Sequence, residues 1–123
     1  MAELAYKYEN VHEPILFTQL TAAATATTSI DLRSEDKMYM YKNILFQITV
    51  AGITTNVIVR GQGSLDDENW FNLDEDEMDV TYTANGTYSV RYEGDGEVRY
   101  ARLYWVSESG GTAATLDVKA FIF

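Results

Sequence analysis

Apolar and polar side chains alternate with a period of two along most of the chain after residue 40. In the segment 43–50, every second position is apolar, namely Ile44, Phe46, Ile48 and Val50. A β-strand with one buried face has this pattern, whereas a helix needs apolar residues three and four positions apart. The segments 56–65, 87–92, 98–106 and 115–123 alternate in the same way and are rich in Val, Ile, Thr, Tyr and Phe, which suit a pleated surface.

Turn-forming residues separate these predicted strands. Gly52 follows the first strand, a polar run at 66–69 follows the second, and Asn85-Gly86 suits a two-residue turn with positive φ at both centres. Gly110-Gly111 precedes the last strand. This pattern predicts an all-β fold, an antiparallel β-sandwich of about eight strands. It leaves both a jelly roll and an immunoglobulin-like sandwich open.

The first 40 residues differ from the rest of the chain. Residues 18–29 are rich in Ala and Thr and are compatible with a short helix, an edge strand or an extended arm, while 30–33 has the pattern of a short strand. We expect residues 1–26 to form an N-terminal arm that packs against the domain or a neighbouring subunit, and 27–123 to form the β-sandwich domain. A frayed terminus is the alternative for the arm.

Composition and charge exclude several classes of protein. With 123 residues, of which 46% are apolar, the chain can fill one modest core. Its 19 acidic residues outnumber 9 basic ones, giving a net charge of −10 that disfavours nucleic acid as a partner. No apolar run approaches the roughly 18 residues of a membrane span, and the start lacks the pattern of a secretory signal. Without cysteine, neither disulfides nor thiolate chemistry is available.

Acidic residues are concentrated in the segment 66–79, and no Lys or Arg occurs between residues 61 and 90. Asp74 and Asp76 fit the first two ligand positions of an EF-hand calcium loop, but Met78 fails the next one. Three interpretations remain: a calcium site in a loop other than an EF-hand, a solvated loop, and an electrostatic docking surface for a basic partner. The candidate residues of that acidic docking surface are Asp74, Glu75, Asp76 and Glu77.

Catalysis has little support in the residues. His12 is the sole histidine, and the motifs of phosphate-binding loops, dinucleotide sites and zinc proteases are missing. We therefore expect neither an enzyme nor a cofactor. Trp70 and Trp105 are candidates for a sugar-binding platform; the alternative is that Trp70 fixes the turn before it and that Trp105 fills a core or an interface.

The chain ends on Phe121, Ile122 and Phe123. We expect these three apolar residues to be buried, either in the sheet or against another subunit. The segment 98–106 is apolar on both faces and gives the same indication. Both features favour a homo-oligomer or a docked component over an isolated monomer. The predicted interface residues are Phe121, Ile122, Phe123, Trp105, Tyr6 and Tyr8.

The second half of the chain carries a series of five short sequences typical of β-hairpins. They lie at 61–66 (GQGSLD), 69–73 (NWFNL), 83–88 (TANGTY), 98–103 (VRYARL) and 110–115 (GGTAAT). This order resembles small β-sandwich structural proteins in the virions of tailed bacteriophages, which include capsid decoration (cement) proteins and tail or fibre accessory proteins. The acidic run at 74–79 departs from that pattern.

The resemblance implies a non-enzymatic capsid decoration protein that binds the head surface and bridges its subunits. Its implied partners are the major capsid protein or other virion proteins and further copies of itself, with a trimer among the expected oligomers. Its implied location is the virion, assembled in the cytoplasm of the host bacterium. A tail or fibre accessory protein and a glycan-binding β-sandwich module are the alternatives.

Overall fold

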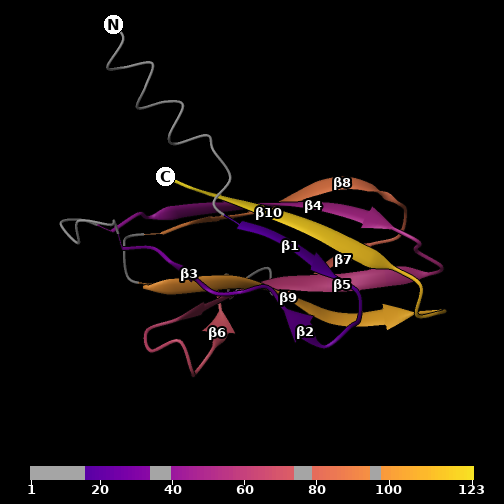
Figure 1. Cartoon of the computed structure of the whole chain (residues 1–123), viewed down its shortest axis with the longest axis horizontal. Helices are drawn as coiled ribbons and strands as arrows, with labels where there is room; N and C mark the ends of the chain where they lie inside the picture. Colours follow the sequence, from indigo (N-terminus) through magenta and orange to yellow (C-terminus); the bar gives the residue numbers. More distant parts are fainter. Residues whose placement is uncertain (1–15, 34–39, 74–78, 95–97) are drawn as a thin grey trace, which may run out of the picture.

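The computed structural model describes residues 16–33, 40–73, 79–94 and 98–123. These residues form ten β-strands and no helix, and every strand pairing is antiparallel. The strands lie in two stacked sheets (Figure 1). The predicted antiparallel β-sandwich is therefore confirmed.

One sheet, sheet A, contains four strands. Its order is β1 (Leu16–Leu20), β10 (Thr115–Ile122), β4 (Asn43–Ala51) and β8 (Gly86–Glu93). The two central strands, β10 and β4, pair over eight residues, and both ends of the chain's described part meet in this sheet.

The other sheet, sheet B, contains six strands but is only four positions wide. The short strands β2 and β3 both pair with β9, β9 pairs with β5, and the far edge of β5 pairs with both β6 and β7. The bounds are β2 (Thr25–Ala26), β3 (Ile30–Asp31), β9 (Tyr100–Ser109), β5 (Asn56–Ser64), β6 (Phe71–Asn72) and β7 (Val80–Tyr82).

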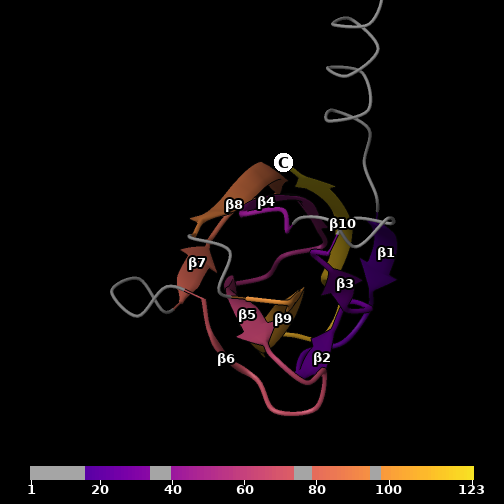
Figure 2. The same cartoon turned by 90° about the vertical axis from the view of Figure 1, so that its left-hand side faces the viewer.

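The strand order is that of a jelly roll. If β2 with β3, and β6 with β7, each count as one position, the chain alternates between the sheets as A, B, A, B, B, A, B, A. Two interlocked Greek keys produce this alternation and enclose the core from both sides, as the end-on view in Figure 2 shows. The choice between jelly roll and immunoglobulin-like sandwich, which the sequence pattern left open, is thus decided by the pairing.

The core lies between the two sheets and follows the alternation along each strand. In β4, Ile44, Phe46 and Ile48 are almost fully buried, and Leu116 and Val118 of β10 lie beside them. Sheet B contributes the buried side chains of β5 and β9, which are Val57, Val59, Ala101, Leu103 and Trp105. Burial of apolar area at roughly 25 cal/mol per Å² is the main stabilising term for such a core.

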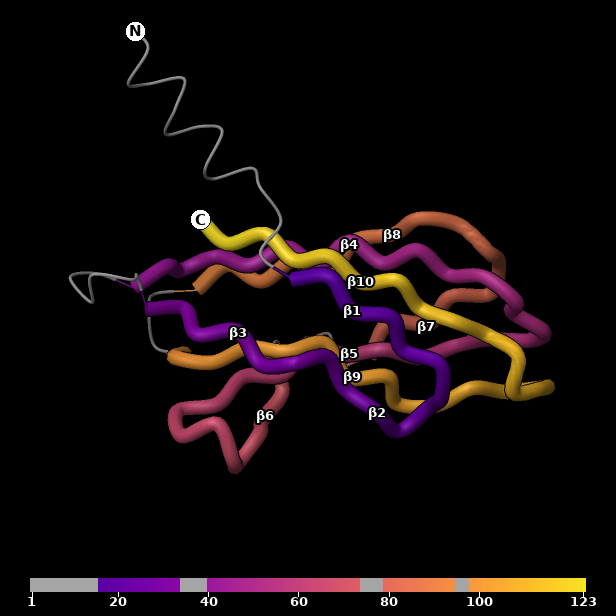
Figure 3. The backbone as a smooth tube through the Cα atoms, in the orientation of Figure 1, coloured from indigo at the N-terminus to yellow at the C-terminus, as the bar shows by residue number. Residues whose placement is uncertain are grey.

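The structure describes residues 16–26 of the predicted N-terminal arm and places two strands of this segment in the sandwich. Leu16–Leu20 is the edge strand of sheet A, and Thr25–Ala26 pairs with β9 in sheet B (Figure 3). Leu16 and Leu20 are buried in the core. The sandwich therefore includes residues 16–26, and of the predicted arm only 1–15 lies outside the described residues.

Gly63 marks a close approach between β5 and its neighbours. A Cβ atom on Gly63 would lie 2.7 Å from Leu73 Cδ2 and 2.9 Å from Val98 Cγ1. At Gly61, the nearest atom to a Cβ would be Leu73 Cδ1 at 3.3 Å. The sequence places two glycines in this strand, and only Gly63 lacks room for a side chain.

We predict that Gly63→Ala lowers the free energy of unfolding by about 1–3 kcal/mol, because Leu73 and the buried Val98 must move. Gly61→Ala is the matched control and should lose less, since its Cβ meets a single methyl group at a tolerable distance. Urea unfolding of both variants measures the difference. Equal stability of the two variants would contradict the packing described for Gly63.

Tyr82 and Tyr88 join the two sheets near the β7–β8 turn. Their rings stack with centroids 4.1 Å apart and planes 15° from parallel. The Tyr88 hydroxyl donates a hydrogen bond of 2.6 Å to the Ala84 carbonyl oxygen, whereas the buried Tyr82 hydroxyl has no partner among the described residues. Burial raises the pKa of Tyr82 to about 12.

The raised pKa predicts a loss of stability at alkaline pH. Below pH 10 the Tyr82 phenol is neutral in both states; between pH 10 and 12 the unfolded chain releases the proton first, so unfolding becomes more favourable as the pH rises. Tyr82→Phe should remove this part of the alkaline loss. At pH 7 it should keep or increase stability, by up to about 1 kcal/mol, because it removes a buried hydroxyl without a partner.

Urea unfolding from pH 7 to 11.5 measures the effect. The control Tyr88→Phe loses a hydrogen bond and should cost about 0.5–1.5 kcal/mol at pH 7. The interpretation fails if Tyr82→Phe loses as much stability as the unchanged protein between pH 10 and 11.5.

Candidate functional site

The outer face of sheet A brings together side chains from distant parts of the sequence. The register places Leu45 of β4 between Phe121 of β10 and Arg91 of β8. It also places Lys119 of β10 opposite Phe17 of β1. The face is therefore built from strand pairing, and its residues point away from the core because their neighbours in each strand point inward.

We call Leu45, Arg91, Phe121 and Phe123 the C-terminal patch. The three apolar side chains are half-buried, and the Arg91 guanidinium lies 5.3 Å from the Phe123 ring centroid while Nη2 pairs with Glu93 at 2.8 Å. The last residue is fixed to β4, because Phe123 and Asn43 exchange backbone hydrogen bonds of 2.9 and 3.1 Å. The end of the chain thus forms an ordered apolar surface.

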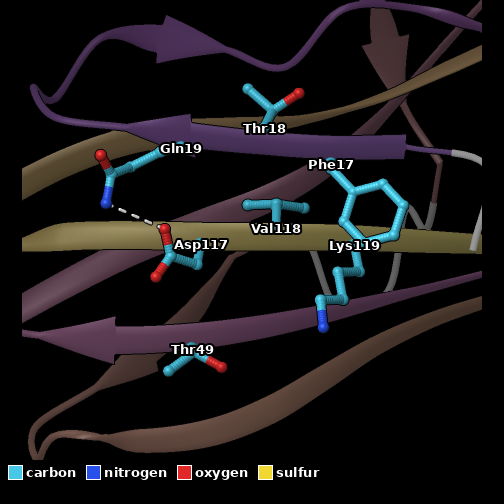
Figure 4. Close-up of a pocket in the computed structure, with 7 residues that line it drawn as sticks. All are labelled: Phe17, Thr18, Gln19, Thr49, Asp117, Val118 and Lys119. Carbon is cyan, nitrogen blue, oxygen red and sulfur yellow. Dashed lines mark hydrogen bonds between the residues drawn. The ribbon is translucent and has the colours of Figure 1, made fainter.

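Beside this patch, a shallow open groove crosses the outer face of β1, β10 and β4 (Figure 4). The Phe17 ring is 68% exposed, and Lys119 Nζ lies 5.6 Å from the ring centroid at the same end of the groove. At the other end, the Gln19 amide donates a hydrogen bond of 3.0 Å to the Asp117 carboxylate. We call this the Phe17 groove; its lining residues are Phe17, Thr18, Gln19, Thr49, Asp117, Val118 and Lys119.

The structure places the predicted interface residues in different parts of the molecule. Phe121 and Phe123 lie on the C-terminal patch, while Ile122 faces inward and packs against the core. Trp105 was predicted at an interface, but it is completely buried between the sheets, so it has no surface to offer a partner. Outside the described residues lie His12, Tyr6, Tyr8 and the acidic candidates Asp74, Glu75, Asp76 and Glu77.

The described start of the acidic segment is an ordered loop between β5 and β6, residues 65–70. The Asp66 carboxylate accepts hydrogen bonds from the Asn69 backbone N–H at 2.8 Å, the Asn69 side-chain amide at 2.7 Å and the Glu68 N–H at 2.9 Å. The buried Ser64 hydroxyl donates to the same carboxylate and accepts from the Asp67 N–H. These bonds hold the pKa of Asp66 well below its usual value, chiefly through Asn69.

Trp70 is the last residue of this loop and lies against Arg102 on the outer face of sheet B. The Arg102 guanidinium is 4.1 Å from the Trp70 ring centroid, and its Nε donates a hydrogen bond of 2.8 Å to Gln62. Burial lowers the pKa of Arg102. One face of the Trp70 ring is thus occupied by the protein itself, which leaves less of it for stacking on a sugar.

Neither metal-ligating clusters nor spanning helices occur in the part of the chain that the structure describes. There, no three His, Cys, Asp or Glu side chains gather in a way that could hold a metal ion. Within the same residues, no helix is long and apolar enough to cross a membrane.

Comparison with known proteins gives no identification. The chain matches no protein-family model and no curated protein sequence.

Three exposed apolar side chains were not singled out from the sequence: Phe17, Leu65 and Phe71. Phe17 belongs to a segment without a clear strand pattern, and its exposure depends on pairing with β10 about a hundred residues later. Leu65 continues the alternation of β5, but the strand ends at Ser64 and the side chain turns into solvent. A leucine directly before a run of acidic residues is the only sequence signal that could have indicated this exposure.

We predict that Asp66→Ala loosens the β5–β6 loop and barely changes the global unfolding temperature. The variant removes the acceptor of four hydrogen bonds in a solvent-facing loop, while the core stays intact. Hydrogen exchange of the Glu68 and Asn69 amides should become faster. Glu68→Ala is the control, because the backbone N–H of residue 68 still donates its hydrogen bond to Asp66 in this variant. Unchanged protection in Asp66→Ala would contradict the assigned hydrogen bonds.

Proposed function

We propose that this protein is a non-enzymatic structural protein of a tailed-bacteriophage virion, a capsid decoration protein that binds the head and bridges its subunits. The observation that carries the proposal is the C-terminal patch, where Leu45, Phe121 and Phe123 form an ordered apolar surface on the outside of sheet A. The sequence resemblance to virion proteins and the jelly-roll topology, which recurs in viral capsid domains, agree with it. Fold alone does not carry function, so the surface is the main support.

The chemistry of such a protein is adhesion by contact area. Removing apolar area from water contributes roughly 25 cal/mol per Å², from which the costs of association are subtracted. Two features of the patch reduce those costs: strand pairing holds its backbone in place, and Phe123 is hydrogen-bonded to β4. Many copies on one head add their small contributions together.

Charge supplies the long-range part of the binding. The net charge of −10 favours solubility, and it attracts the protein to basic areas of a protein shell. On the patch itself, Arg91 is paired with Glu93, so the apolar contact carries no unpaired charge from this pair. The attraction should therefore act on the rate of encounter, and the apolar patch on the lifetime of the complex.

The test is binding of the purified protein to undecorated phage heads. We expect saturable co-sedimentation and an increased temperature of head disruption. The double variant Phe121→Ser with Phe123→Ser should weaken binding roughly tenfold or more, because it removes the apolar centre of the contact. Thr87→Ala, on the outer face of β8 and away from the patch, is the matched control and should bind normally.

Circular dichroism and thermal melting of the free variants establish that they fold. Failure of the unchanged protein to bind heads would remove the proposal for the capsid. Imaging of labelled virions then distinguishes the tail or fibre location, because label would appear on the tail and not on the shell.

A further inference from the structure

The most exposed large apolar side chains of the described residues lie on opposite sides of the sandwich. Phe17, 68% exposed, lies in the groove on sheet A. Leu65 and Phe71, 64% and 45% exposed, lie at the two ends of the β5–β6 loop. Figures 1 and 3 show this loop projecting from sheet B on the side away from β1 and β10. The molecule thus has a projection with exposed apolar side chains on one side and a groove with an exposed phenylalanine on the other.

The β5–β6 loop is ordered before it meets any partner. Asp66 and the buried Ser64 together make hydrogen bonds to three successive backbone N–H groups and to the Asn69 side chain. At its far end, Trp70 is held by Arg102. A projection fixed in this way loses little conformational entropy on docking, so its exposed apolar groups contribute more of their burial energy to affinity.

The β5–β6 loop and the Phe17 end of the groove carry opposite charges. Asp67 and Glu68 are exposed on the loop and form no ion pair with any described residue. In the groove, Lys119 lies at the Phe17 end and forms no ion pair within the described ranges, while the Asp117 carboxylate lies at the other end and accepts a hydrogen bond from Gln19. The loop therefore presents apolar groups beside exposed carboxylates, and the Phe17 end of the groove presents an apolar ring beside an ammonium group.

We propose that the β5–β6 loop of one copy docks in the Phe17 groove of a second copy. Leu65 and Phe71 pack on Phe17, and the carboxylates of the loop face Lys119. The contact is heterologous, since it joins two different surfaces, and such contacts build closed rings or open chains. With a net charge of −10 on each copy, placing the carboxylates of the loop beside Lys119 reduces the general repulsion between the copies.

This self-contact leaves the C-terminal patch available to another protein, because the groove and the patch are neighbouring but different parts of sheet A. It does not rest on the proposed function, since it is measured on the purified chain without any phage component. If the unchanged protein binds heads but does not self-associate, the self-contact alone is rejected. If it self-associates but does not bind heads, the proposed function alone is rejected.

The test uses complementary variants in sedimentation velocity over a concentration series. The unchanged protein should associate beyond the monomer. Phe17→Ser removes the groove but keeps the loop, and Phe71→Ser weakens the loop but keeps the groove, so each alone should stay monomeric. An equimolar mixture should form a dimer and nothing larger, because one intact loop and one intact groove remain.

A monomeric unchanged protein would overturn the proposal. So would variants that associate normally, or a mixture that stays monomeric although both variants fold by circular dichroism. Leu65→Ser replaces Phe71→Ser if the latter unfolds, because Leu65 is the more exposed of the two. A symmetric contact between identical surfaces would not be rescued by mixing.

A charge exchange tests the polar half of the contact. Lys119→Glu should weaken self-association roughly tenfold or more by placing like charges together. Combining it with Glu68→Lys in the same chain should restore association. Thr81→Ala, at an exposed position of β7 opposite Ile58, should leave association unchanged. If Lys119→Glu associates as the unchanged protein does, or if the double variant is no better than the single one, Lys119 does not face the loop and the proposed docking is wrong.

Discussion

The mutual burial of the two sheets' inner faces is the constraint on which the rest of the structure depends. An antiparallel sheet with one apolar face is stable only when that face is covered. Here the side chains of β4 and β10 cover those of β5 and β9, and Trp105 fills the space between them. Because successive side chains of a strand point to opposite sides, burying one set fixes which residues face outward. The core therefore determines the two outer surfaces, although it takes no part in any contact they make.

The outer surfaces differ in a way that suits a protein acting through contact. On sheet A, strand register joins Phe17, Leu45 and Phe121, three residues far apart in the sequence, into one partly apolar face. On sheet B, the projecting feature is a loop whose order comes from Asp66. The net charge of −10 makes both surfaces more favourable for partners that carry basic groups.

The sequence predicted the strands whose alternation is strong and missed features that depend on pairing. The strand at 43–50 and the last strand were correct because their inner positions are uniformly apolar. Trp105 was misplaced because 98–106 is apolar on both faces, so the pattern could not tell core from interface. The edge strand Leu16–Leu20 was assigned to an arm, since most of its contacts come from β10 at the other end of the chain. The jelly-roll order likewise follows from long-range pairing, which local alternation does not encode.

The proposed binding to phage heads is tested most directly by hydroxyl-radical footprinting of the protein, free and mixed with heads. Side-chain oxidation reports solvent contact residue by residue. The proposal predicts that Phe121 and Phe123 lose reactivity on the heads, while their reactivity in the free protein matches a half-exposed surface. Equal oxidation of both residues in the free and bound forms, with protection appearing elsewhere, would contradict the assignment of the C-terminal patch as the contact surface.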